Sequence, residues 1–104
     1  MLINNHEPLI CPRCGGETMH SLTVTVFDRG EDAKLVTRTE VLGGFVASHL
    51  IPNEASANPS SRRHAVTIDF CCEACDDPES SGCTLILSQH KGQTEVIWEI
   101  PSQE

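Results

Sequence analysis

The sequence predicts an all-β domain, and three observations support this. Several short segments alternate apolar and polar residues, no segment shows the apolar stripe of an amphipathic helix, and turns containing Gly or Pro separate the segments. The 104 residues fit one small domain, over 1–104, with a thin core. One Trp, three Phe and no Tyr make that core aliphatic and modest, so a metal ion or another crosslink is an expected supplement.

The first half of the chain predicts three strands. In 21–27 the side chains of Leu22, Val24 and Val26 share one face, which is typical of a half-buried strand. A polar, Gly-containing turn follows, and the β-branched segment after it is expected to return as the partner strand. A Gly pair then breaks the chain. The expected elements are a strand over 21–27, a turn over 28–33, a strand over 34–42 and a strand from about Phe45.

The second half predicts an exposed loop and three further strands. The loop, 52–63, is small, polar and proline-bearing, and we expect it to be the most mobile part of the chain. A strand over 64–70 follows, and strands over 84–90 and 94–100 flank a short "KGQ" turn, which is the pattern of a hairpin. The alternation places six side chains inward: Val66, Ile68, Phe70, Val96, Trp98 and Ile100.

The net charge and the absence of long apolar stretches argue against a nucleic-acid-binding or membrane-spanning protein. Asp and Glu outnumber Lys and Arg by 15 to 7, for a net charge of −8, and such a surface repels nucleic-acid phosphates at long range. A protein partner is therefore more expected than a nucleic acid. No stretch approaches the roughly 18 apolar residues of a membrane span, and the N-terminus lacks the pattern of a secretory signal. We expect a cytoplasmic setting, in which thiols stay reduced.

Two cysteine pairs carry the chemistry. "CPRC" and "CEAC" each separate two cysteines by two residues, a spacing that lets a tight turn aim both sulfurs at one ion. Pro12 fixes a turn after the first sulfur, and Gly15 permits the backbone that follows the second. The sequence therefore predicts one structural Zn²⁺, with iron as another metal that takes four thiolates. The predicted ligands are Cys11, Cys14, Cys72 and Cys75.

The distance between the two pairs does not prevent a shared site. In the usual arrangement about 15 to 20 residues separate the pairs, whereas 57 residues lie between Cys14 and Cys72. Tripling a loop adds only about 1 kcal/mol of closure entropy. Structural zinc binding contributes roughly 10 to 16 kcal/mol at neutral pH, so the metal outweighs the longer loop.

Other uses of the cysteines remain open at this stage. Each half of the chain could hold its own metal, one site with His6 and His20 and the other with Cys83 and His90. A redox dithiol would need a lowered thiol pKa, and no helix follows "CPRC" to supply it. Cys71 is expected to be a small buried residue, and Cys83 could lie across from it. A disulfide between them could form in an oxidised preparation but is not expected in the cytosol.

Two charged segments are candidate partner surfaces. Asp76, Asp77 and Glu79 crowd the second cysteine pair, beside a four-thiolate zinc centre that is itself anionic, and could form an acidic contact surface. Arg62 and Arg63 form the only positive cluster and could hold a phosphate or a partner carboxylate. For each segment the alternative is simply a solvated loop.

The cysteine motifs and the strands beside the second pair resemble zinc ribbons. This resemblance implies a three-stranded antiparallel sheet formed by 64–70, 84–90 and 94–100, with 21–63 as a β-rich insertion between the two halves of the zinc site. The segments "VFDRGEDA", "NPSSRRH" and "QHKGQTEVIWE" also resemble small proteins of bacterial prophages and mobile elements. That second resemblance implies a bacterial setting and no particular activity.

These observations predict a binding module and no enzyme. Zinc would fix the fold, and the acidic surface would select a protein partner. The first alternative is a zinc ribbon that binds nucleic acid through Arg62, Arg63 and Lys91. The second is a thiol redox sensor, which predicts a metal-free protein with a reactive cysteine.

Overall fold

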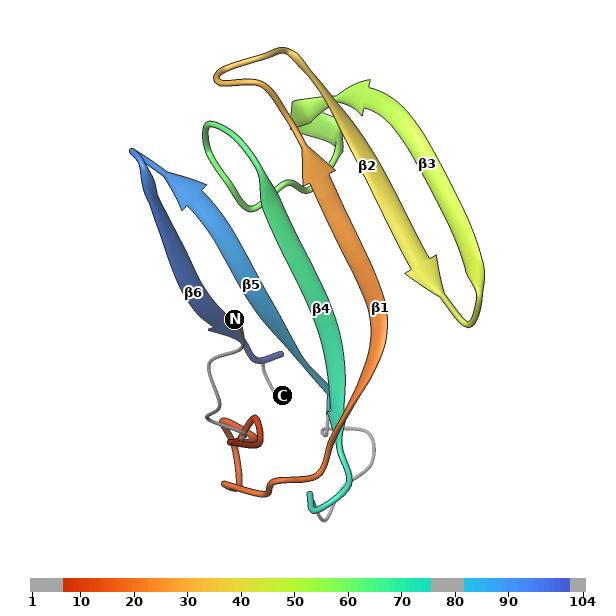
Figure 1. Cartoon of the computed structure of the whole chain (residues 1–104), viewed down its shortest axis with the longest axis vertical. Coiled ribbons are helices and arrows are strands. Elements are labelled where there is room, and N and C mark those ends of the chain that lie inside the picture. The colour runs from red at the N-terminus through yellow and green to blue at the C-terminus, as the bar shows by residue number, and fades with distance from the viewer. Residues whose placement is uncertain (1–6, 76–81, 102–104) are drawn as a thin grey trace, which may run out of the picture.

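Six antiparallel strands form one open sheet in the order β3-β2-β1-β4-β5-β6 (Figure 1). The computed structural model describes residues 7–75 and 82–101. The fold is all-β, as predicted, with one short 3-10 helix, η1. The elements are β1 (Met19–Asp28), β2 (Leu35–Leu42), β3 (Phe45–Pro52), η1 (Asn53–Ala55), β4 (Ala65–Cys72), β5 (Gly82–His90) and β6 (Gln93–Glu99).

Two tight hairpins join neighbouring strands, one at the Gly pair where the sequence predicts a break and one at the predicted "KGQ" turn. Gly43 and Gly44, between β2 and β3, both have positive φ, of 57° and 86°. Lys91 and Gly92, between β5 and β6, have φ of 50° and 77°. Two successive positive φ angles match the twist of a two-residue hairpin, and this backbone favours Gly at the turn.

The predicted insertion joins the same sheet as the three strands expected of a ribbon. β4, β5 and β6 are adjacent and antiparallel. On the other side of β4, β1 pairs antiparallel with it from Met19↔Cys72 to Phe27↔Ala65, with a register shift between Ser21 and Val24. The hairpin of β2 and β3 continues the sheet from β1. The two cysteine pairs therefore belong to one continuous sheet.

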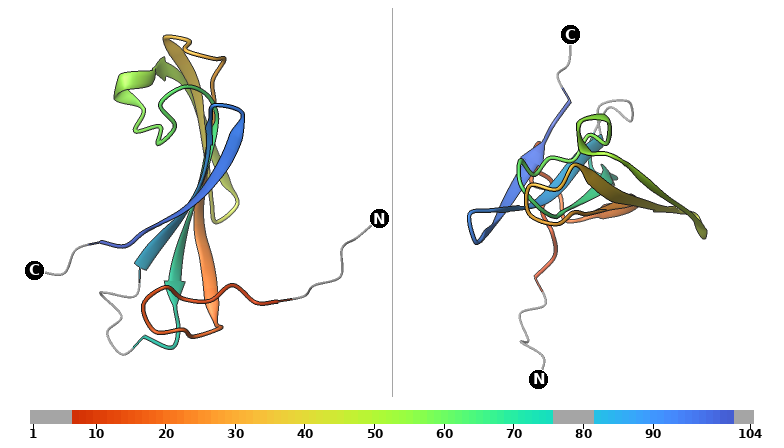
Figure 2. Two further views of the ribbon diagram at one scale, coloured as in Figure 1. Left: turned by 90° about the vertical axis from the view of Figure 1, so that its left-hand side faces the viewer. Right: turned by 90° about the horizontal axis from the view of Figure 1, so that it is seen from above.

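The buried core lies on one face of the sheet, near the end that the loop 53–64 covers. Phe27, Val36 and Ala65 form a buried cluster, with Ile51 packed against it. The side view shows the loop and η1 on one side of the sheet (Figure 2). The Arg38 guanidinium lies 5.8 Å from the centre of the Phe27 ring and shields it further.

The loop is more firmly held than the sequence predicts. Ser56 and Ser60 are among the most buried residues, although we expected the whole segment to be exposed. The Ser60 hydroxyl donates to the Gln89 carbonyl at 2.6 Å and accepts from the backbone amide of Arg63 at 3.0 Å. The Asn58 side chain donates to the Arg63 carbonyl at 3.0 Å. Small polar residues here satisfy the loop backbone, so the loop can pack on the strands.

The face that the sequence predicts to be inward is largely uncovered. Val26, Val66 and Val96 do share one face, because Val26 pairs with Val66, and Val66 and Val96 both pair with Leu87. However, Val96 is 65% exposed and Val26 is 39% exposed, while the buried cluster lies on the opposite face. The sequence thus predicts correctly which side chains share a face but not which face is buried, because the loop covers the face that carries Phe27 and Ala65.

Truncating Val36 should destabilise the fold far more than a larger truncation at the other end of the same strand. Val36 is fully buried, so Val36→Ala should lower the free energy of unfolding by about 2 kcal/mol through lost burial and the cavity left behind. Leu42→Ala removes more atoms, but from an exposed side chain. It should therefore change the free energy of unfolding by less than about 0.5 kcal/mol. Urea denaturation measures both. Equal losses would contradict the position of the core.

Candidate metal centre

The pairing of β1 with β4 brings the two cysteine pairs to the same end of the sheet. We call Cys11–Gly16 the first knuckle and Cys72–Cys75 the second. The first knuckle precedes β1 and the second follows from the end of β4, where Met19 pairs with Cys72. The backbone amide of Glu73 then donates to the Thr18 carbonyl at 3.0 Å, which continues the contact past the strands. Figure 1 shows both segments at this end of the sheet.

The first knuckle is a tight turn that directs backbone amides at its sulfurs. The amide of Gly15 donates to the Cys11 carbonyl at 3.0 Å, and the amide of Cys11 donates to the Gly16 carbonyl at 2.9 Å. The amides of Arg13 and Gly16 point at the sulfurs of Cys11 and Cys14, each at 3.4 Å. Gly15 has φ of +75°, the left-handed backbone anticipated at this position. These amides stabilise thiolate charge.

The four sulfurs have the spacing of a tetrahedral thiolate site. Cys14 and Cys72 lie 3.5 Å apart, Cys14 and Cys75 3.7 Å, and Cys11 and Cys75 3.8 Å, measured between Sγ atoms. All four Sγ atoms lie within 4.8 Å of one another. A metal–sulfur distance of about 2.3 Å gives tetrahedron edges of about 3.8 Å. The cluster therefore could hold one metal ion. A disulfide, at about 2.05 Å, is much shorter than these contacts.

The pKa values of the Cys11, Cys72 and Cys75 thiols shift in different directions. Burial disfavours the Cys11 thiolate, yet backbone hydrogen bonds at Cys14 and Arg13, together with the Cys72 and Cys75 thiols, lower the pKa of Cys11 to about 7. Burial and the neighbouring thiols raise the pKa of Cys75 to about 12, and burial raises the pKa of Cys72 in the same direction. One thiolate is thus stabilised at the expense of its neighbours. A cation would remove this conflict by neutralising all four.

The alternative arrangements of the cysteines do not fit the described geometry. His90 ends β5 at the hairpin, seven positions along the strand from Cys83 and at the other end of the sheet from the second knuckle. Cys83 pairs with Phe70, whereas Cys71 pairs with Gly82, so their side chains project from opposite faces of the sheet. The suggested disulfide between Cys71 and Cys83 is therefore wrong. His6 lies outside the described residues.

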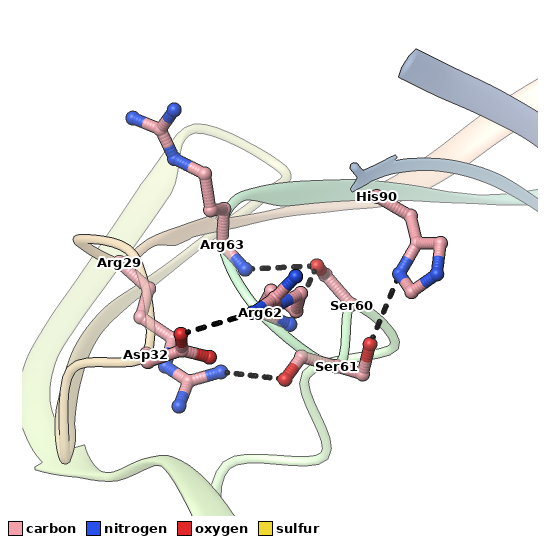
Figure 3. Close-up of polar contacts among 7 residues, drawn as sticks. All are labelled: Arg29, Asp32, Ser60, Ser61, Arg62, Arg63 and His90. Atoms are coloured by element: carbon pink, nitrogen blue, oxygen red, sulfur yellow. Dashed lines mark hydrogen bonds and ion pairs between the residues drawn. The ribbon is translucent and has the colours of Figure 1, made fainter. Parts of the chain in front are cut away.

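Of the predicted partner residues, the structure describes only the two arginines. Asp76, Asp77 and Glu79 lie outside the described residues. Arg62 and Arg63 lie on the loop between η1 and β4 (Figure 3). This loop is away from the end of the sheet that carries the knuckles (Figure 1). Arg62 forms an ion pair with Asp32 at 3.4 Å.

Two features near the centre were not anticipated from the sequence. His20 and Glu73 form an exposed contact at 3.1 Å between Nε2 and Oε2, beside the second knuckle. Gly16 is in close contact with the other knuckle: a Cβ there would lie 2.7 Å from the Ala74 Cβ and 3.3 Å from the Cys14 sulfur. The doubled Gly after "CPRC" was the signal, but only the fold shows what Gly16 approaches.

A comparison of the chain with protein-family models, with curated proteins and with solved structures finds no match. The resemblance to zinc ribbons thus rests on the cysteine cluster and the strands beside it, and the resemblance to prophage proteins has no further support. Among the described residues, no helix has the length and apolar character needed to cross a membrane.

Adding a methyl group at Gly16 should push the two knuckles apart. Gly16→Ala cannot be accommodated without moving Ala74 and the sulfurs, so we expect metal affinity to fall by about ten-fold or more. Competition with a chromophoric chelator measures this. The matched control is Gly30→Ala, whose new Cβ would meet only the Ala33 Cβ at an ordinary 3.8 Å. Unchanged affinity in Gly16→Ala would contradict the close docking of the knuckles.

Proposed function

We propose that this chain is a zinc-stabilised, non-enzymatic binding module that recognises a protein partner through an acidic surface. The observation that carries the proposal is the sulfur geometry: Cys11, Cys14, Cys72 and Cys75 approach within 4.8 Å of one another, with individual spacings that fit a tetrahedron of thiolates. Four soft ligands of this kind select Zn²⁺, and iron is the other metal for which the donor set is suited.

Zinc would stabilise the end of the sheet away from the loop 53–64. The described apolar core is small, and it lies beneath the loop at the other end. Structural zinc contributes roughly 10 to 16 kcal/mol in small metal-binding domains, which is comparable with the whole stability of an ordinary domain at about 5 to 15 kcal/mol. A fold of this size would therefore depend on the metal.

The same geometry supports a structural role for the metal. Catalytic zinc keeps one position open for water or substrate, whereas four thiolates close the tetrahedron. A redox role for Cys11 has support only from its lowered pKa. Reactive cysteines are partly exposed, and Cys11 is only 2% exposed, which favours a structural thiolate.

The acidic surface is the proposed basis of partner selection. The net charge is −8, and Glu17 and Glu73 are exposed next to the two knuckles. Because the metal would fix the knuckles, the neighbouring carboxylates would present negative charge in one orientation to a basic protein surface. Such complementarity raises the association rate and excludes acidic competitors.

Nucleic-acid binding is the second candidate, and a local cluster of positive residues favours it. Arg62 and Arg63 are adjacent on the loop, and Ser61 joins them to the β5–β6 hairpin through a 3.2 Å contact with His90. Lys91 follows at the tip of that hairpin. Figure 3 shows the Arg63 side chain extending away from the other labelled residues, while Arg62 is turned toward Asp32. The Asp32 ion pair weakens the patch.

Replacing Cys72 should abolish metal binding, while replacing its neighbour should not. Cys72→Ser removes one of the four ligands, so we expect less than stoichiometric zinc after desalting and a large loss of thermal stability. Cys71→Ser is the matched control, because Cys71 points to the opposite face of β4. It should retain one zinc per chain. Elemental analysis and thermal melts measure both. Metal loss from both variants, or from neither, would contradict the assigned ligands.

Charge reversal beside the metal centre should weaken partner binding. With zinc-loaded protein immobilised, we expect proteins captured from a bacterial lysate to elute with salt, and Glu17→Lys with Glu73→Lys to reduce capture several-fold. Glu54→Lys, on η1 at the other end of the sheet, is the matched control and should leave capture unchanged.

The same protein can be titrated with mixed-sequence single-stranded DNA and RNA. Binding at low salt that falls steeply with added salt and is lost on Arg62→Ala and Arg63→Ala would favour nucleic acid and contradict the protein-partner proposal.

A further inference from the structure

A row of apolar side chains crosses the whole sheet on the face opposite the loop. Paired strand residues project to the same face, so the register defines the row directly. It contains one residue from each strand, in sheet order: Val46, Val41, Val24, Ile68, Leu85 and Trp98. In the next row, the four strands β1, β4, β5 and β6 contribute apolar residues, which are Val26, Val66, Leu87 and Val96. We call this surface the apolar face.

The apolar face has little cover from the described part of the chain. The loop 53–64 and η1 lie on the other side of the sheet (Figure 2). Val46 and Val96 are about two-thirds exposed, at 68% and 65%. Ile68 and Leu85, in the middle of the row, are only half-buried despite having strands on both sides. A soluble monomer rarely exposes an apolar surface that spans a whole sheet.

Charged side chains of the strands lie almost entirely on the opposite face. Arg38 pairs with Phe27 of the buried cluster, and Glu40 lies two positions along the same strand. Asp69 pairs with Thr84, and Thr84 with Glu99, so these carboxylates share that face as well. Among the described strand residues, only Asp28, at the end of β1, adds a charge to the apolar face. A surface with so little charge offers little electrostatic basis for selecting a different protein.

The size of the apolar face matches what a stable dimer needs. Six strands spaced about 4.8 Å apart, each with about eight residues at 3.3 Å, give the whole sheet a flat face of roughly 750 Å². Projecting side chains raise the accessible area to about 800 Å², which is the contribution of each partner to a standard protein interface. An identical sheet has the same width and length, so a second copy fills this surface completely.

We propose that two copies of this chain pack their apolar faces together to form a symmetric β-sandwich. A sheet normally buries one face against a second layer, and sheets pack face to face with their strands about 30° apart. A two-fold axis would place each face on its identical partner. The loop and the charged face would remain outside, and the metal centre would lie at one end of the interface, because Cys72 shares a face of β4 with Ile68 and Phe70. The observations that carry this dimer involve neither the metal nor the partner proposed above.

The mass of the zinc-loaded full-length chain in solution tests the proposal. Sedimentation equilibrium should give twice the 11.3 kDa mass of one chain at micromolar concentration. A mass of one chain up to about 100 μM, far above the dissociation constants of standard-size interfaces, would overturn the proposal. Metal content, measured on the same sample, separates this outcome from a failure of the metal centre.

Adjacent residues on β6 identify the surface that forms the dimer. Val96 lies on the apolar face and Ile97 on the opposite face, and both are exposed. Val96→Lys should raise the dimer dissociation constant by at least about ten-fold, because it places an unpaired ammonium group in an apolar interface. Ile97→Lys makes the same change in net charge and should leave the dissociation constant unchanged. Val26→Lys, on the central strand β1, should act like Val96→Lys.

The same variants show whether the apolar face or another surface of the chain forms the dimer. Circular dichroism and metal content establish that each variant is folded. A dimer that persists in both folded Val96→Lys and folded Val26→Lys would show that another surface joins the copies, and would overturn the proposal.

Discussion

The antiparallel pairing of β1 with β4 is the contact on which the rest of the structure depends. It joins the hairpin of β2 and β3 to the three-stranded unit of β4, β5 and β6, and so makes one sheet from two halves of the chain. The same register places Met19 opposite Cys72 and brings the knuckles together. A pairing between distant segments costs loop entropy that local hairpins do not. Four thiolates around a cation would more than offset that cost at this end of the sheet.

The two ends of the sheet are stabilised by different means, which explains how a chain with so few large side chains can hold six strands. At one end the loop buries Phe27, Val36 and Ala65 and satisfies its own backbone through Ser60 and Asn58. At the other end the sulfurs occupy the space that a core would fill. Between them the apolar face supplies a third surface, and its burial in a dimer would provide the second layer that a single sheet lacks.

The elements that the sequence predicts well are those set by local physics. Alternation and Gly-bearing turns placed all six strands and the hairpin of β5 and β6, and the two short cysteine spacings identified the four thiols that the fold brings together. The side of the sheet that is buried could not be predicted in this way, because it depends on where Ser60 and the rest of the loop pack. For the same reason, the sequence does not show that Gly16 contacts Ala74 or that His20 contacts Glu73.

X-ray absorption at the metal edge tests the four-sulfur centre most directly, because it reports the atoms bound to the ion without reference to stability. On full-length protein loaded with zinc, the account predicts a single shell of four sulfur atoms at about 2.3 Å. A shell containing nitrogen or oxygen at about 2.0 to 2.1 Å would contradict convergence of the four thiolates on one ion. Such a result would mean that the two knuckles do not bind one ion through all four sulfurs, and that the metal does not hold β1 and β4 together at this end of the sheet.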